Sequence, residues 1–130
     1  MRKSIAAANW KMNLTWQQGE QLIDQLLAGM EPLAEHKKVI LAVPFPYLHM
    51  AHEKVKNQPA VFIAAQNCYS KMNGAYTGEV SVEMLQSIGI HFVVLGHSER
   101  REYFNESNQF LADKVNIFIA NNIHPIFFFV

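Results

Sequence analysis

Five short runs of consecutive apolar residues, separated by stretches with helical spacing, constrain the fold of this chain most strongly. The runs are continuous rather than alternating, as expected for parallel strands that are covered on both faces of a sheet. Strands that alternate with helices are typical of βαβ units with right-handed crossovers. The sequence therefore predicts an α/β fold with a parallel sheet, whose buried strands are residues 5–8, 39–43, 61–65, 92–95 and 126–130.

Helix start signals precede the stretches between these runs. Thr15 and Gln18 have the spacing of a capping box, in which each side chain bonds the backbone N–H of the other residue. The other expected starts are Pro46 for a second helix, Ser81 for a third, and Asn105 or Ser107 for a fourth.

Residues at helical spacing mark the face that each helix is expected to bury. We interpret these stripes as core rather than as cofactor-binding residues, because large apolar side chains are mostly buried in folded proteins. The stripes are Leu22, Ile23, Leu26, Leu27 and Met30; Leu48, Ala51 and Val55; Val82, Leu85 and Ile88; and Phe110, Leu111, Lys114, Val115 and Phe118.

Length and composition limit the class of protein. The 130 residues suffice for one ordinary domain, which we expect to span residues 1–130. Eleven acidic and eleven basic residues balance, so the chain lacks the basic surplus of proteins that bind nucleic acid or an anionic membrane. No signal peptide and no apolar stretch of membrane-spanning length is recognisable. The single cysteine, Cys68, excludes an internal disulfide, and we expect a cytoplasmic protein.

A histidine follows the fourth apolar run, directly after Gly96 and at the start of a predicted short helix. An imidazole there lies among free backbone N–H groups at the positive end of the helix dipole, which disfavours its protonated form. His97 is therefore a candidate electrophile for carbonyl chemistry, acting as a neutral ring. The alternative is that His97 only caps the helix, which the position alone favours because structural histidines outnumber catalytic ones.

A second polar patch follows the first apolar run. Asn9 and Lys11 are two residues apart, so in extended backbone their side chains point the same way. An amide donor beside an ammonium group suits a substrate with a phosphate and a developing oxyanion. The alternative is a solvated strand end, where the aliphatic part of the lysine covers apolar surface.

Together these patches carry a family resemblance. The motif Asn-Trp-Lys-Met-Asn at residues 9–13 and the motif Leu-Gly-His-Ser-Glu-Arg-Arg at residues 95–101 resemble the triosephosphate isomerase family. Residues 65–69 (Ala-Gln-Asn-Cys-Tyr) and 74–79 (Gly-Ala-Tyr-Thr-Gly-Glu) resemble its long third loop, and the likeness runs from about residue 5 to about residue 127. The resemblance implies a (β/α)8 TIM barrel, which takes roughly 31 residues per strand–helix unit. The chain is thus expected to form the N-terminal half of a barrel, with about four β/α units and a fifth strand.

The resemblance implies interconversion of dihydroxyacetone phosphate and glyceraldehyde 3-phosphate, a step of glycolysis and gluconeogenesis. Asn9 and Lys11 would bind the triose phosphate, and His97 would polarise its carbonyl group as a neutral imidazole. Ser98, Glu99 and Glu106 would have supporting roles: Ser98 near the site, Glu99 paired with Lys11, and Glu106 packed beneath. No metal-ligand spacing and no glycine-rich dinucleotide motif is recognisable, so we expect neither a metal nor a cofactor.

The connection over residues 66–79 is long and rich in turn residues. One interpretation is a surface loop without a partner. The resemblance implies instead that it reaches into a neighbouring subunit of a homodimer. The interface residues expected on that basis are Met12, Asn13, Gln66, Tyr76 and Thr77.

The resemblance also implies what the chain lacks. The family's catalytic glutamate and closing lid follow the sixth strand, and its phosphate-binding amides follow the seventh and eighth strands. We therefore expect the truncated 130-residue chain to be inactive alone. A half barrel has two open sheet edges, which can pair with another chain. The alternative function is accordingly a non-catalytic, self-associating half-barrel module.

Overall fold

The five predicted strands form one parallel sheet in the order β1-β2-β3-β4-β5. The computed structural model describes residues 1–129. The strands are β1 (Ser4–Asn9), β2 (Lys37–Val43), β3 (Val61–Ala65), β4 (Phe92–Leu95) and β5 (His124–Phe127). The helices are α1 (Trp16–Gly29), α2 (Leu48–Val55), α3 (Val82–Ser87), α4 (Ser98–Tyr103) and α5 (Asn108–Ala120), with a 3-10 turn η1 (Phe45–Tyr47) before α2. The prediction of an α/β half barrel is confirmed.

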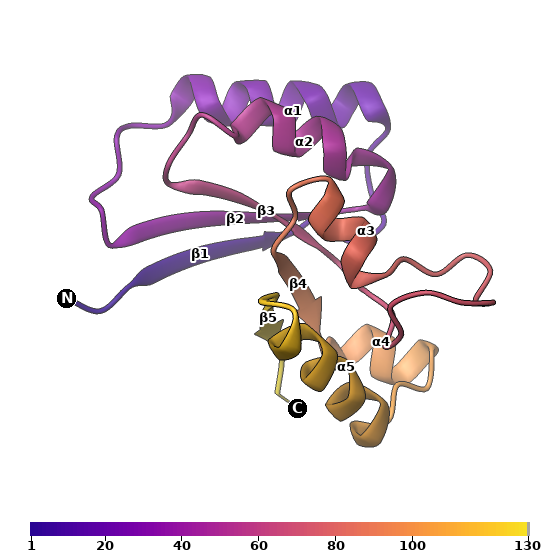
Figure 1. Cartoon of the computed structure of the whole chain (residues 1–130). Coiled ribbons are helices and arrows are strands. Elements are labelled where there is room, and N and C mark those ends of the chain that lie inside the picture. The colour runs from indigo at the N-terminus through magenta and orange to yellow at the C-terminus, as the bar shows by residue number, and fades with distance from the viewer. Residues whose placement is uncertain (130) are drawn as a thin grey trace.

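The sheet curls because neighbouring strands are staggered. Val39 on β2 pairs with Val61, the first residue of β3. The pairing of β3 with β4 is limited to Ala64 with Phe92 and Ala65 with Val93, so β4 starts where β3 ends. A stagger of this kind tilts strands relative to the axis of a barrel. The helices lie outside the curl, and β1 and β5 form its two ends (Figure 1).

Three of the predicted helix starts are confirmed. Thr15 and Gln18 form both hydrogen bonds of the capping box. The Ser81 and Ser107 hydroxyls accept hydrogen bonds from the backbone N–H groups of Met84 and Phe110, which satisfies donors that a helix start leaves free. Asn105, the other candidate for the fourth start, does not cap a helix. It lies between α4 and α5 with a φ of 54°, a left-handed conformation that asparagine tolerates better than most residues.

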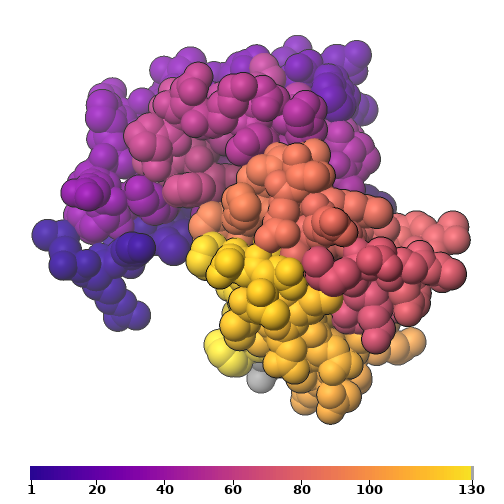
Figure 2. Space-filling view, viewed as in Figure 1, coloured from indigo at the N-terminus to yellow at the C-terminus, as the bar shows by residue number. Residues whose placement is uncertain are grey.

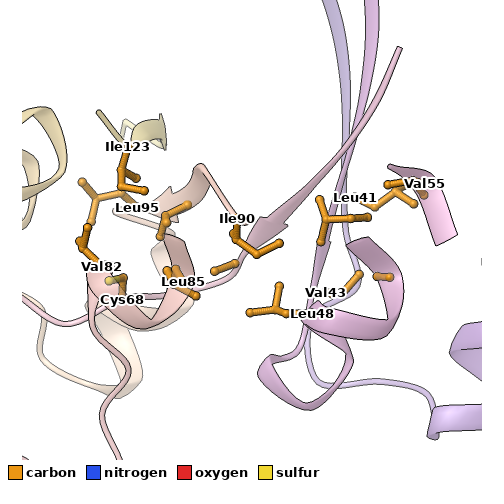
Figure 3. Packing of buried hydrophobic residues seen from close by; sticks show 14 of the residues in the cluster. Leu41, Val43, Leu48, Val55, Cys68, Val82, Leu85, Ile90, Leu95 and Ile123 are labelled. Carbon is orange, nitrogen blue, oxygen red and sulfur yellow. The ribbon is translucent and has the colours of Figure 1, made fainter. Parts of the chain in front are cut away.

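The main core lies between the sheet and the helices. Outward-facing strand residues such as Leu41 and Val43 pack there with Leu48 and Leu85 from the helices (Figure 3). Ile23 on α1 belongs to the same cluster. Most of the residues in the predicted stripes contribute to this core. The prediction that Leu22 is buried is wrong, because its side chain remains 42% exposed. Leu22 precedes the fully buried Ile23 by one residue, about 100° around the helix, and therefore faces away from the sheet.

The alternate strand residues form a second, smaller cluster on the concave face. Ile40 and Ala42 lie between the outward-facing residues of β2, and they meet Ala64 and Val94 from the neighbouring strands. Half-buried rings and branched chains surround this cluster: Phe62, Phe92 and Ile126. The sheet is therefore apolar on both faces, although its helices cover only one.

The prediction that the first strand is buried is wrong. Residues 4–8 are all exposed, and Ile5 retains 55% of its accessible surface. Within residues 1–129, β1 pairs with β2 alone, so its other edge is open. Figure 2 shows the N-terminal residues, in indigo, standing out from the body of the molecule.

The predicted bounds of the last strand are also wrong, because β5 begins two residues earlier, at His124. The His124 N–H donates to the His91 carbonyl, and the Phe128 N–H donates to the Leu95 carbonyl. Pro125 is accommodated within β5 because an edge strand needs no N–H on its open side. Residue 130, the predicted end of the strand, lies outside the described residues.

Lys114 is a buried cation on α5, with 1% of its surface accessible. Its ammonium group donates to Glu106 Oε2 at 2.6 Å and to Asn67 Oδ1 at 2.8 Å. A buried ammonium needs such partners, because transfer of an unpaired charge out of water is very costly. Lys114 therefore fixes α5 to the loop before it and to the long loop after β3.

Among the helices of residues 1–129, none combines the length and the apolar character that crossing a bilayer requires.

We expect Lys114→Met to lower the free energy of unfolding by about 3–5 kcal/mol, because it leaves the Glu106 carboxylate buried without its closest cation. Chemical denaturation followed by circular dichroism measures the change. Lys54→Met is the matched control, since Lys54 pairs with the largely exposed Asp24. An equal decrease in the free energy of unfolding for both substitutions would contradict this account of Lys114.

Candidate functional site

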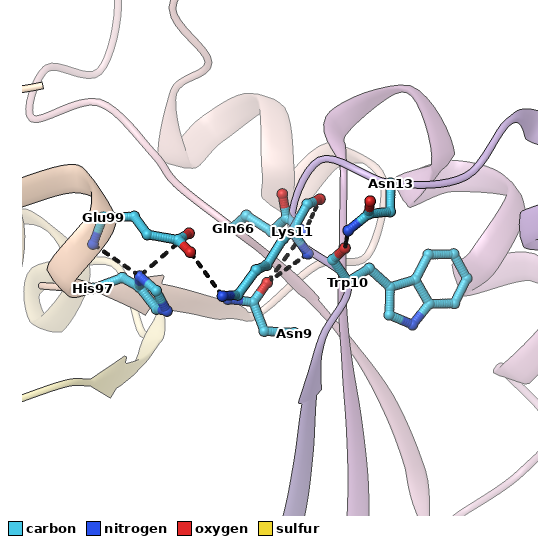
Figure 4. Close-up of polar contacts among 7 residues, drawn as sticks. All are labelled: Asn9, Trp10, Lys11, Asn13, Gln66, His97 and Glu99. Carbon is cyan, nitrogen blue, oxygen red and sulfur yellow. Dashed lines mark hydrogen bonds and ion pairs between the residues drawn. The ribbon is translucent and has the colours of Figure 1, made fainter. Parts of the chain in front are cut away.

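A cavity of about 270 Å³ opens at the carboxyl ends of the strands, where active sites of parallel barrels lie. The two polar patches found in the sequence meet there: Asn9 ends β1, Lys11 lies in the turn after it, and His97 follows β4 (Figure 4). The remaining lining residues are Met12, Phe45, Gln66, Asn67, Val94, Glu99, Arg100 and Phe104. The cavity therefore combines cationic, carboxylate and amide groups with apolar side chains.

Asn9 and Lys11 are brought together by a turn and not, as predicted, by extended backbone. Asn9 is the last residue of β1, and Lys11 has a φ of 56°. The Lys11 N–H donates to Asn9 Oδ1 at 2.9 Å. Asparagine side chains compete with regular structure in this way by bonding the backbone two residues on. The turn ends the strand and sends the lysine side chain across the site.

The predicted ion pair between Lys11 and Glu99 is present. Lys11 Nζ lies 2.7 Å from Glu99 Oε1, and both side chains are about half exposed. The hydrogen bond from the Lys11 ammonium lowers the pKa of the Glu99 carboxyl. The pair joins the turn after β1 to the first turn of α4.

His97 caps α4, as the alternative interpretation of the sequence proposed. Its Nδ1 atom accepts the backbone N–H of Glu99 at 3.2 Å, whereas the Glu99 carboxylate lies 3.6 Å away, beyond hydrogen-bond length. A ring nitrogen that accepts carries no proton, so the proton of the neutral ring lies on Nε2. The capping hydrogen bond thus fixes the tautomer of His97 and leaves Nε2 as a donor. Helix capping is therefore compatible with a role of His97 in polarising a carbonyl group.

The environment of His97 includes contacts that the sequence alone did not predict. The Phe128 ring packs edge-on against the imidazole, with centroids 5.1 Å apart. Arg101 Nε donates to the carbonyl of Gly96 at 2.8 Å, and Arg101 Nη1 donates to Asn108 Oδ1 at 2.8 Å. Gly96 has a φ of 74°, and a side chain there would collide with the Phe128 carbonyl. The only sequence signal for this packing was the aromatic end of the fifth apolar run.

Glu106 is buried, with 5% exposure, and does not itself line the cavity. Besides Lys114, it faces Arg100 on α4, whose Nε atom lies 3.2 Å away without hydrogen-bond alignment. Asn67, the other partner of Lys114, lines the cavity. This buried group connects the helix that carries His97 to the loop after β3. Ser98 is the first residue of α4 and is exposed; it does not line the cavity.

The residues expected at a subunit interface lie in two places. Met12 and Gln66 line the site, and Met12 is 94% exposed. Asn13 is exposed beside them and donates to the Trp10 carbonyl at 2.9 Å. Tyr76 and Thr77 lie on the projecting loop between β3 and α3 (Figure 1), where the Tyr76 ring packs on Tyr69 with centroids 4.7 Å apart.

Other reactive groups do not add to the site. Burial raises the pKa of the Cys68 thiol to about 12, so it stays protonated and is a core residue rather than a nucleophile. Among residues 1–129, no three histidine, cysteine or acidic side chains are grouped so that they could hold a metal ion.

We expect Lys11→Met to raise the pKa of Glu99 toward its ordinary value, because the charged carboxylate loses its hydrogen-bond donor. Because the pKa is lowered in the folded chain, the ionised Glu99 carboxylate stabilises the fold at pH values above the ordinary pKa of glutamate. This contribution is lost as the pH falls through the lowered pKa. Carbon-13 NMR of the Glu99 carboxyl measures the titration. Lys71→Met, which changes an exposed lysine outside the site, should leave it unaltered. An unchanged Glu99 titration in Lys11→Met would refute the pairing.

Comparison with known proteins agrees with this geometry. Residues 4–128 match the family model described as triosephosphate isomerase. The chain is 46% identical over 127 residues to the triosephosphate isomerase of Cytophaga hutchinsonii, covering 98% of this chain and 50% of that protein. It is 42% identical over 128 residues to that of Phocaeicola vulgatus, with the same coverage, and 43% identical over 129 residues to that of Flavobacterium johnsoniae, covering 99% and 51%. The chain spans about half the length of these curated relatives, and it belongs to the triosephosphate isomerase family.

Proposed function

We propose that this chain supplies the substrate-polarising half of an active site that interconverts dihydroxyacetone phosphate and glyceraldehyde 3-phosphate. The observation that carries the proposal is the meeting of Asn9, Lys11 and His97 at one cavity. Asn9 ends β1, Lys11 follows it, and His97 follows β4, although nearly ninety positions separate the first two residues from the third in the sequence.

The three groups suit an enediolate, the oxyanion that forms when a proton leaves the carbon beside a carbonyl group. His97 Nε2 donates a hydrogen bond to the carbonyl oxygen as negative charge develops on it. Lys11 attracts the phosphate and the oxyanion. Asn9 Oδ1 already accepts the Lys11 N–H, so its NH2 group is the part of the amide that would donate to the substrate.

The proton on carbon requires a separate base. Glu99 does not fit this role, because its carboxylate is paired with Lys11. We assign the base, the lid and the main phosphate-binding amides to the half of the enzyme that this chain does not match. Positioned proton transfer contributes about 100- to 10,000-fold to a rate, so the 130-residue polypeptide alone is proposed to be inactive.

The cellular setting follows from the family. We propose a cytoplasmic enzyme of glycolysis and gluconeogenesis that acts as a homodimer without a metal or cofactor. The exposure of Met12, Tyr76 and Thr77 is consistent with an interface through the long loop. Ser98, Glu99 and Glu106 support the site by starting α4, pairing with Lys11 and anchoring α4 from below.

Reconstitution tests the enzymatic proposal. The 130-residue polypeptide and a separately produced C-terminal half of the Cytophaga hutchinsonii relative are each expected to show background activity in a coupled isomerase assay. The mixture is expected to isomerise triose phosphates. His97→Gln should lower its turnover by at least about 100-fold, because the neutral imidazole donor is lost. His36→Gln is the matched control, because it makes the same substitution at a histidine that does not line the cavity.

Two outcomes would reject this assignment. One is brisk turnover by the 130-residue polypeptide alone. The other is a folded, stable complex of the two halves that has no activity.

A second candidate function is a non-catalytic half barrel that associates with copies of itself. The exposed β1 favours it, as do the open sheet edges and the concave face, over which no helix of residues 1–129 packs. Apolar faces and unpaired strand edges both tend to be covered by another chain.

Sedimentation velocity tests self-association. The polypeptide is expected to form dimers or larger species at high micromolar concentration. Ile5→Lys should shift the distribution toward monomer, because Ile5 is exposed and lines the concave face with Ile40 and Phe62. Met84→Lys, at an exposed apolar residue of α3, should have no effect. A stable monomer at all concentrations would rule out this second function.

A further inference from the structure

Gln66, the first residue after β3, makes more contacts with the site than its expected place at an interface explains. Its amide nitrogen lies 2.9 Å from the Lys11 carbonyl, 3.1 Å from the Ala42 carbonyl and 3.4 Å from Asn9 Oδ1. These acceptors belong to the ends of β1 and β2. A single half-buried side chain thus ties together the carboxyl ends of three strands (Figure 4).

The orientation of both amides is determined by their partners. Two backbone carbonyls face the Gln66 amide, and carbonyls only accept, so the atom between them is the NH2 nitrogen. The Lys11 backbone N–H faces the Asn9 amide, so that atom is Oδ1. Asn9 Oδ1 then accepts from Lys11 and from Gln66 at once. The arrangement is self-consistent and directs the Asn9 NH2 group away from these contacts.

Lys11 needs such support because its backbone is strained. A φ of 56° is a left-handed conformation, which is sterically unfavourable for a residue with a side chain. Its N–H is held by Asn9 and its carbonyl by Gln66, so hydrogen bonds fix the residue on both sides. The Lys11 ammonium in turn reaches Glu99 at 2.7 Å. Without the hydrogen bond from Gln66, the left-handed conformation of Lys11, which directs its side chain across the site, is less stable.

We propose that Gln66 is a positioning residue whose amide clamps the left-handed backbone of Lys11 and thereby presents the lysine ammonium to Glu99 and to the phosphate-bearing substrate. The substrate part of this inference rests on the proposed function. The positioning itself does not, because it concerns contacts within the chain.

The experiment compares Gln66→Met with the unaltered polypeptide by NMR. Methionine has a similar length and no donor, so the substitution removes the NH2 group that makes all three contacts, with little change in volume. Two signals report the result: the titration of the Glu99 carboxyl, and the strong NOE between the amide and α protons of Lys11 that a positive φ produces. We expect the Glu99 pKa to rise, as in Lys11→Met, and the Lys11 NOE to weaken.

Gln66→Asn is the second variant, in case Gln66→Met does not fold. It keeps the amide but is one methylene shorter, so it cannot reach the Lys11 and Ala42 carbonyls together, and the same two changes are expected. Gln109→Met is the matched control, since Gln109 is exposed on α5 and its amide donates to Asp113, away from the site. Amide spectra of each variant verify that the fold is retained.

A Glu99 titration and a Lys11 NOE that remain as in the unaltered polypeptide, in either folded variant, would overturn the positioning role. Neither readout involves substrate. A failure of reconstituted isomerase activity would therefore count against the proposed function alone, and unchanged NMR signals would count against the role of Gln66 alone.

Discussion

The ion pair between Lys11 and Glu99 joins two strand ends that are not neighbours in the sheet. β1 and β4 are separated by β2 and β3, and strands in a flat sheet are roughly 4.8 Å apart. A flat sheet would hold these ends three such spacings from one another. The pair closes to 2.7 Å because the staggered strands curl and because lysine is long. The meeting of Asn9, Lys11 and His97 depends on the same curvature.

The site is built largely from groups that also end or start regular structure. Asn9 terminates β1 by bonding the Lys11 N–H, and His97 begins α4 by accepting the Glu99 N–H. Each of these bonds occupies one polar atom of the side chain and leaves another, the Asn9 NH2 or the His97 Nε2–H, for a ligand. Structural and catalytic interpretations of these residues are therefore not exclusive, because a cap fixes the orientation that polarising a carbonyl group needs.

Burial is distributed unevenly over the sheet. The convex face is covered by helices and anchored by the buried group of Lys114, Glu106 and Asn67. Within residues 1–129, no helix covers the concave face, whose apolar residues are buried only by neighbouring side chains, and β1 is exposed. The same geometry explains both candidate functions, since a second half of a barrel or a second copy of this chain would cover the same surfaces.

The order and type of the elements could be read from the sequence, because continuous apolar runs and capping residues such as Thr15 and Ser81 act locally. The two polar patches could be found for the same reason: each directly follows an apolar run. The exposure of β1, the left-handed turn at Lys11 and the three contacts of Gln66 could not. They depend on which strands are neighbours and on how far the sheet curls, and local sequence does not encode distances between segments that meet only in the folded chain.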